Sequence, residues 1–249
     1  MGGTGRARLA VVAVFAANGV LFGNWAVRIP DVKEALGLSE AALGGALLVP
    51  AVGALISMPL TGALSSRLGS RTATAGMTVA FCLVPALLGL APSLPWLVPA
   101  LFVFGLAFGG LDVAMNAQAV TVERAVGRPV MSSFHAAFSG GALVGSLTGA
   151  LAAAVALPVA AHLGSTGLVL LAICGPLIPA MLREEGTTAG ERGPLFAWPT
   201  GRLLPLAVIA LAALLAEGAV ADWSAVHLRQ ELGASAGTAG LAFTAFSLT

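Results

Sequence analysis

The sequence contains a series of apolar stretches of about 20 residues, and these restrict the possible folds more than any other feature. A helix that crosses the ~30 Å hydrocarbon core of a bilayer needs about 20 mostly apolar residues. Such stretches lie at about 9–28, 41–64, 72–91, 96–121, 131–156, 158–182 and 203–227, and an eighth begins near Ala236. They are too long for the strands of a membrane barrel and lack the alternation of such strands. We therefore predict an all-α integral membrane protein.

The composition supports a bilayer as the surrounding solvent. Hydrophobic residues make up 58% of the chain and charged residues only 9%, whereas soluble domains are about 25% charged. A net charge of +1 gives no electrostatic reason to expect a nucleic-acid partner. Cys82 and Cys174 each lie inside an apolar run, and the three histidines are far apart in the sequence. We therefore expect no disulfide, metal site or cofactor.

The arginine and lysine residues predict the orientation in the membrane. With the N-terminus in the cytoplasm, nine of these residues fall on the inner side and three on the outer side. Positive charge is enriched in cytoplasmic loops, so we predict a multi-pass protein of the cell's inner (plasma) membrane with a cytoplasmic N-terminus. The inner set is Arg6, Arg8, Arg67, Arg71, Arg124, Arg128, Arg183, Arg192 and Arg202, and the outer set is Arg28, Lys33 and Arg229.

The apolar stretches divide the chain into three parts. Residues 1–182 hold six predicted spans, residues 183–202 are polar and rich in charge and glycine, and residues 203–249 hold a seventh span and part of an eighth. The middle part has the composition of a cytoplasmic linker. The eighth stretch has about 14 residues, or ~21 Å of helix, which is too short to span the bilayer. We expect the sequence to be a piece of a twelve-helix protein, with a natural short product as the alternative.

Six helices, a charged linker and further helices form a layout that resembles the major facilitator superfamily. The loop "GALSSRLGSRTAT" resembles the loop signature of that family at Gly62, Arg67, Gly69 and Arg71. Ser66 occupies the position where the family usually has an aspartate. The resemblance implies a complete N-terminal six-helix half, followed by helix 7 and part of helix 8, of a carrier that works by alternating access. It also implies a monomer when the protein is full length.

Two further stretches resemble the fucose-permease-like branch of sugar:proton symporters. One is "GLDVAMNAQ", in which Asp112 and Asn116 match an acidic residue and an asparagine of that branch. The other is "GNWAVRIPDVKEALGLSEAALG". The chain departs from the branch near Ala26, where the branch often has an acidic residue in helix one. This branch implies protons and a small sugar or sugar-like solute as partners.

Asp112 is the main candidate for proton coupling. A charged residue in the middle of a spanning helix costs ~2.5–3.5 kcal/mol by insertion scales, so it is expected to face water or a polar partner. Asn116 follows four residues later on the same helical face, and Glu217 is a second intramembrane carboxylate, in the seventh span. We predict that Asp112, Asn116 and Glu217 bind protons or substrate. The alternative is a structural hydrogen bond to a neighbouring helix.

Three other residues are candidates for the substrate cavity. Asn24 and Trp25 lie in the first span, which lines the central cavity in the family that the chain resembles, and His135 titrates near neutral pH. An interfacial position for the tryptophan and a hydrogen bond from the histidine to a loop carbonyl are the alternatives. Arg28, near the end of the same span, is expected to extend to the membrane surface.

Three glycines in the fifth span predict a close contact between helices. Gly141, Gly145 and Gly149 form two consecutive GxxxG steps, which let two helix backbones approach each other. We interpret this face as the contact along which the two halves rock.

The predicted function is secondary active transport of a small solute, coupled to protons, and not enzymatic catalysis. An exporter of amphipathic compounds and a non-transporting protein on the same scaffold are the alternatives. His135 and Ser139 are four residues apart, as a serine-protease dyad in the membrane could be. We set that class aside because the sequence has no second motif for an oriented base or an oxyanion hole.

Overall fold

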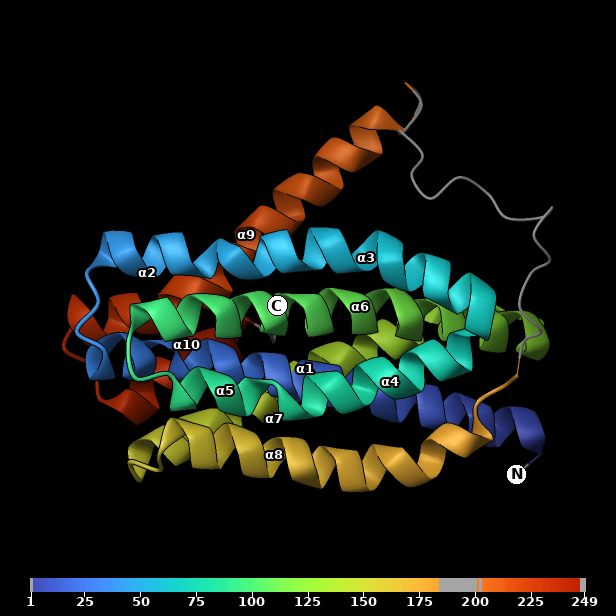
Figure 1. Ribbon diagram of the computed structural model, residues 1–249, viewed down its shortest axis with the longest axis horizontal. Helices are drawn as coiled ribbons and strands as arrows, with labels where there is room; N and C mark the ends of the chain where they lie inside the picture. The colour runs from blue at the N-terminus through green and yellow to red at the C-terminus, as the bar shows by residue number, and fades with distance from the viewer. Residues whose placement is uncertain (1, 184–200, 202, 247–249) are drawn as a thin grey trace.

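The computed structural model describes residues 2–183, 201 and 203–246, and Figure 1 shows them as a bundle of long helices. The predicted linker, residues 183–202, lies outside the described residues except for positions 183 and 201. The helices are α1 (Gly3–Ala35), α2 (Glu40–Leu47), α3 (Val49–Leu68), α4 (Ser70–Leu83), α5 (Pro85–Leu90), α6 (Leu94–Val126), α7 (Met131–Ala154), α8 (Val159–Cys174), the 3₁₀ helix η1 (Gly175–Ala180), α9 (Leu204–Gln230) and α10 (Ala236–Phe246).

The seven predicted spans are confirmed within the described part of the chain. Seven helical segments are long and apolar enough to cross a membrane, and three of them consist of two consecutive helices. The interruptions at Leu48 and Val84 come just before Pro50 and Pro85. Proline has no N–H for the helical hydrogen-bond ladder, and its ring clashes with the carbonyl of the preceding turn. The helical hydrogen bonding is therefore interrupted at these two points, while the two helices on either side still form one continuous span.

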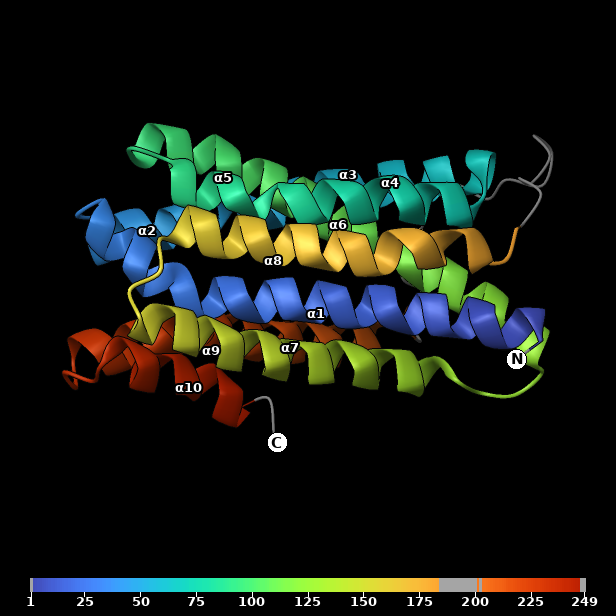
Figure 2. The same cartoon turned by 90° about the horizontal axis from the view of Figure 1, so that it is seen from below.

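The spans alternate in direction, so the bundle has two ends. We name the end that holds Gly3, Gly69 and Gly127 the basic end, because the arginines predicted to be cytoplasmic cluster there. The opposite end, with the connections at residues 36–39, 91–93, 155–158 and 231–235, is the far end. Both views place the N-terminus at the basic end (Figures 1 and 2).

Helix α1 lies in the centre of the bundle, between α8 and α7 (Figure 2). Its contact with α7 is very close, because glycines on both helices face the backbone of the other. A Cβ added to Gly145 would lie 2.1 Å from the carbonyl oxygen of Val20, and one added to Gly19 would lie 2.0 Å from that of Phe138. No side chain fits at these positions, and the two backbones touch.

This contact corrects one interpretation of the glycine pattern. Gly141 and Gly145 face backbone atoms of Ala16 and Val20, and Gly149 faces Asn24 and Val27. All of these partners belong to α1, in the same six-helix half. The glycines therefore fix two helices within one half, and the described residues of the second half contact α7 at other positions.

Helix α9 joins the bundle only with its second part. Residues 204–216 are exposed, and the first buried residue of the helix is Ala221. In Figure 1 the start of α9 points away from the other helices, and its later turns approach them toward the far end. Helix α9 thus meets the six-helix half near the far end and separates from it toward the basic end (Figure 1), whereas α10 stays in contact with α7 as far as Thr244.

Candidate functional site

Four phenylalanines from four helices form an aromatic cluster inside the bundle. Phe22 of α1 stacks on Phe108 of α6, with ring centroids 5.5 Å apart. It also contacts Phe138 of α7 at 6.2 Å and Phe243 of α10 at 5.9 Å. Because α10 follows the linker and the other three helices precede it, the cluster joins the two parts of the chain.

A polar residue lies one helical turn from the cluster on each of the three helices of the first half. Asn18 precedes Phe22 by four residues, Asp112 follows Phe108 by four, and His135 precedes Phe138 by three. Helices α1 and α7 run from the basic end and α6 runs toward it, so all three polar residues lie on the basic-end side of the cluster. We call Asn18, Asp112 and His135 the polar layer.

Contacts of His135 and Asn18 with neighbouring helices hold this layer in place. The ring of His135 on α7 meets Phe15 of α1 edge-on, with ring centroids 5.5 Å apart. Asn18 is buried, and its amide nitrogen donates to the sulfur of Met115 on α6 at 3.5 Å. Its Oδ1 atom has no hydrogen-bond partner among the described residues.

Asp112 and Asn116 interact, as their spacing predicts. The amide nitrogen of Asn116 donates to the carboxylate of Asp112 at 3.2 Å and to its backbone carbonyl at 2.9 Å. Both side chains are half-buried. The asparagine therefore supplies one donor to the carboxylate and leaves other acceptor positions open.

Asn24 and Trp25 lie beyond Phe22, on the far-end side of the aromatic cluster. Asn24 is fully buried against α7 and accepts a hydrogen bond from Thr148 at 3.2 Å. Trp25 is buried against Phe104 of α6, with ring centroids 6.0 Å apart. Their role in a substrate cavity stays a prediction, and both have packing contacts that place them away from the polar layer. Glu217 is half-buried where α9 first approaches the bundle, and its role also stays a prediction.

The far end carries a cluster of charges that we did not predict from the sequence. Arg229 of α9 forms ion pairs with Asp31 and with Glu34 of α1, the second at 2.6 Å. Asp31 also pairs with Arg28 at 2.5 Å. Lys33 donates to Gln230. These bonds hold the end of α9 against the end of α1.

The environment of Arg28 differs from the expected one. We predicted that this side chain extends to the membrane surface, but it is buried. It donates to the carbonyl of Leu157 at 2.6 Å and lies 3.2 Å from Nδ1 of His162. Because these partners and Asp31 surround the guanidinium, it is satisfied inside the protein.

Small residues form the second contact between the two parts of the chain. Ser146 of α7 and Thr244 of α10 share a hydrogen bond of 2.6 Å. A Cβ on Gly240 would lie 2.8 Å from that of Ala150. The α7 face with Ser146 and Ala150 therefore supplies the contact between the parts that we had assigned to Gly141, Gly145 and Gly149.

Comparison with known proteins decides the family. The family model described as Major Facilitator Superfamily matches residues 9–249. The chain belongs to the Major Facilitator Superfamily. This is a family of membrane transporters and not of enzymes, which agrees with the expectation from the sequence.

Relatives in this superfamily are longer than this chain. The chain is 39% identical to the uncharacterized transporter y4wD of Sinorhizobium fredii (strain NBRC 101917 / NGR234), over 95% of the chain and 63% of that protein. It is 37% identical to an uncharacterized MFS-type transporter of Yersinia pestis, over 92% of the chain and 59% of that protein. It is 30% identical to the membrane protein MosC of Rhizobium meliloti, over 96% and 58%. The chain thus spans about three fifths of the length of these relatives.

A solved structure confirms the predicted superfamily fold. The chain superimposes on the nucleoside transporter NupG with a TM-score of 0.71 at 10% identity, over 100% of this chain and 63% of that one. At this identity the likeness concerns the fold alone. The chain corresponds to six spans, a seventh and part of an eighth.

The superfamily loop motif forms the turn between α3 and α4. Gly69 is the single residue between these helices and has φ 81°, a conformation that favours glycine. Arg67 is exposed, and Arg71 is half-buried in the first turn of α4. The hydroxyl of Ser66, at the usual aspartate position, donates to the carbonyl of Ala63 at 2.8 Å. The role of Gly62, Arg67, Gly69 and Arg71 in conformational change stays a prediction.

Proposed function

We propose that the complete protein imports a small sugar or sugar-like solute together with protons, by alternating access. Asp112 is the proton-binding residue, and Asn116, His135 and Asn18 contribute polar contacts to the solute. The observation that carries this proposal is the position of the polar layer. It lies directly on the basic-end side of the aromatic cluster, where α9 has separated from the six-helix half.

The chemistry of the layer suits a proton-linked carrier. Asp112 is a half-buried carboxylic acid in an apolar helix, and a carboxyl group can bind and release a proton as the surrounding site changes. Asn18, Asn116 and His135 present amide and imidazole groups, which donate to and accept from hydroxyl groups. The aromatic faces beside them offer a flat apolar surface of the kind that one face of a sugar ring contacts.

The contacts between the parts of the chain support the proposed mechanism. The ion pairs of Arg229 and the contact of α10 with α7 close the bundle from the far end to the aromatic cluster. If the basic end is cytoplasmic, this arrangement corresponds to a carrier open to the cytoplasm. Import then requires these contacts to break so that the site opens to the outside.

Transport by membrane vesicles tests the proposal. The complete protein is assayed with a panel of labelled neutral monosaccharides, deoxy sugars included, with and without an imposed proton gradient. We expect gradient-driven accumulation by the wild type, and Asp112→Asn is expected to lose accumulation but to keep exchange of solute across the membrane. Full accumulation by Asp112→Asn contradicts the role of Asp112, and proton-driven efflux favours the exporter.

A further inference from the structure

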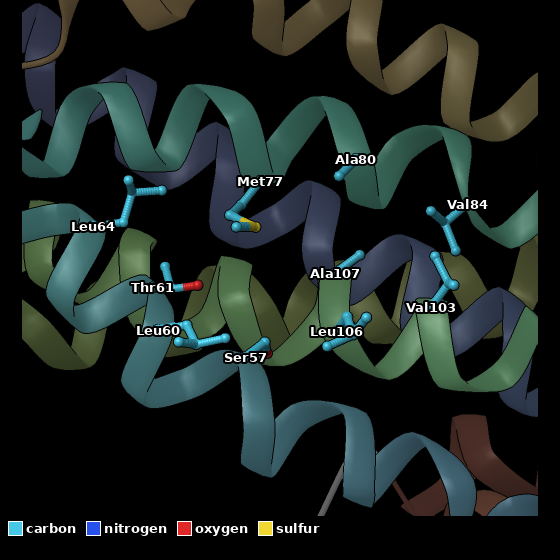
Figure 3. Close-up of a pocket in the computed structure, with 10 residues that line it drawn as sticks. All are labelled: Ser57, Leu60, Thr61, Leu64, Met77, Ala80, Val84, Val103, Leu106 and Ala107. Carbon is cyan, nitrogen blue, oxygen red and sulfur yellow. The ribbon is translucent and has the colours of Figure 1, made fainter. Parts of the chain in front are cut away.

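A groove lies on the bundle surface between α3, α4 and α6, and Figure 3 shows the side chains that line it. Its volume is about 490 Å³, within the 300–1,000 Å³ typical of small-molecule sites. Helix α6 forms the floor, and α3 and α4 form the walls. The lining is apolar except for two hydroxyls, and its main members are Leu60, Leu64, Met77, Val84 and Leu106.

The groove lies on the side of the six-helix half away from the described residues of the second part of the chain (Figure 2). Figure 2 shows α3 and α4 on the opposite side of α1 from α7, α9 and α10. Leu60 at its rim is 64% exposed and Val103 is 38% exposed. Both residues lie in helices that are long and apolar enough to cross a membrane, so we expect lipid chains to reach them.

The two hydroxyl groups of the groove, those of Ser57 and Thr61, do not indicate a polar ligand. The hydroxyl of Ser57 donates to the carbonyl of Ala54 in its own helix. Thr61 is 1% exposed and packs against Gly110 of the floor. The occupant that fits the lining is a flexible hydrocarbon chain.

Positive charge lies at the basic end of the groove. Leu60, Leu64 and Arg67 are spaced by four and three residues, so they share one face of α3. Arg71 follows just after the turn at Gly69. Neither arginine forms an ion pair or a hydrogen bond with the residues that the structure describes, so two guanidinium groups are available to an anion.

We propose that this groove binds one acyl chain of an anionic phospholipid, whose phosphate is held by Arg67 and Arg71. Basic sites between spanning helices on the cytoplasmic side suit anionic headgroups, and each arginine near the surface adds attraction to them. The apolar groove binds the acyl chain of the lipid, and the two arginines favour a lipid whose headgroup is negatively charged.

Native mass spectrometry of the complete protein tests this proposal. Purified, delipidated protein is reconstituted with equal amounts of phosphatidylglycerol and phosphatidylcholine and released from the bilayer with its bound lipid. We expect one phosphatidylglycerol to stay bound in preference to phosphatidylcholine. Equal retention of the two lipids would overturn the proposal.

Two variants separate the contributions of charge and groove. Arg67→Gln/Arg71→Gln is expected to weaken phosphatidylglycerol binding about 10-fold or more, whereas Arg124→Gln/Arg128→Gln, at another turn of the basic end, is the control and keeps it. Ala80→Phe fills the groove and is expected to abolish retention, and Val79→Phe, on the neighbouring exposed position of α4, is its control. Retention that is insensitive to both test variants contradicts the proposal.

A second measurement serves if Ala80→Phe does not fold. Phosphatidylglycerol with a photoreactive group in its acyl chain is crosslinked to the wild type, and the modified peptides are sequenced. Crosslinks within residues 57–64, 77–84 or 103–107 are expected. Crosslinks spread evenly over the lipid-facing helices would show nonspecific contact and overturn the site.

Discussion

Arg229 of α9 and Asp31 of α1 form an ion pair that connects two residues 198 positions apart in the sequence. It lies at the far end, whereas α9 is exposed along residues 204–216, toward the basic end. The same two helices therefore meet at one end and separate at the other. This asymmetry is what alternating access requires of one of its two states.

Arg229→Gln is expected to loosen the far end. The variant removes ion pairs with Asp31 and Glu34, and charge-assisted hydrogen bonds contribute ~1.5–3 kcal/mol each to stability. Partial exposure of Arg229 and a remaining amide donor reduce the net effect to about 1–2 kcal/mol, a factor of roughly 5–30 in the opening equilibrium. The measurement is the rate at which a membrane-impermeant maleimide labels a cysteine introduced at Ala221, which is buried against Ala26 of α1 about two turns before Arg229.

Glu231→Gln is the matched control for this labelling. Glu231 lies just after α9, is exposed and takes part in no ion pair with the described residues. In this variant, the cysteine introduced at position 221 is expected to be labelled at the same rate as in the parent protein. Equal rates for Arg229→Gln and its parent would show that the ion pairs do not hold the far end closed.

Gly145→Ala is expected to destabilise the first half of the protein. The new methyl group would lie 2.1 Å from the carbonyl oxygen of Val20, so α1 and α7 must move apart. Overpacking of this kind costs ~1–3 kcal/mol, although alanine favours a helix more than glycine does. Thermal unfolding of the purified protein in detergent measures the loss.

Gly140→Ala provides the comparison, because no atom lies within 4 Å of an added Cβ at that position of the same helix. We expect the thermal unfolding midpoint of Gly140→Ala to equal or slightly exceed that of the wild type. An unfolding midpoint of Gly145→Ala that also equals or exceeds the wild-type value would refute the close α1–α7 contact.

Glu123→Ala is expected to weaken the start of α7. The carboxylate of Glu123 accepts hydrogen bonds from the backbone N–H groups of Val130 and Met131, both at 2.7 Å. Loss of a helix-capping group costs ~0.5–2 kcal/mol. Hydrogen exchange of the first turn of α7 should accelerate, while exchange in the middle of the helix stays unchanged. Unaltered exchange at residues 130–133 would contradict this role.

The spans could be predicted from the sequence because a run of about 20 apolar residues is enough to indicate a membrane-spanning helix. The stretch expected at about 96–121 lies within α6, and the turn at Gly69 lies where the loop motif placed it. The Asp112–Asn116 hydrogen bond also follows from helical spacing, because both residues belong to one helix. Local patterns determine these features, so one sequence is enough to find them.

The relations between helices could not be predicted in the same way. Phe22, Phe108, Phe138 and Phe243 are unremarkable apolar residues in four separate spans, and only the fold brings them together. The glycines of α7 correctly predicted a close contact, but their spacing does not name the partner helix. The charges near residues 28–34 and at Arg229 did carry a signal, because opposite charges at two ends of spans on one side of the membrane can pair.

Proton movement coupled to solute uptake tests the central claim most directly. De-energised cells that produce the complete protein are given a transported monosaccharide, and the external pH is recorded for the wild type and for Asp112→Asn. The account predicts alkalinisation with the wild type and none with Asp112→Asn, while the variant still exchanges the solute. Alkalinisation of equal size in both would contradict it, because the proton would then bind at another residue.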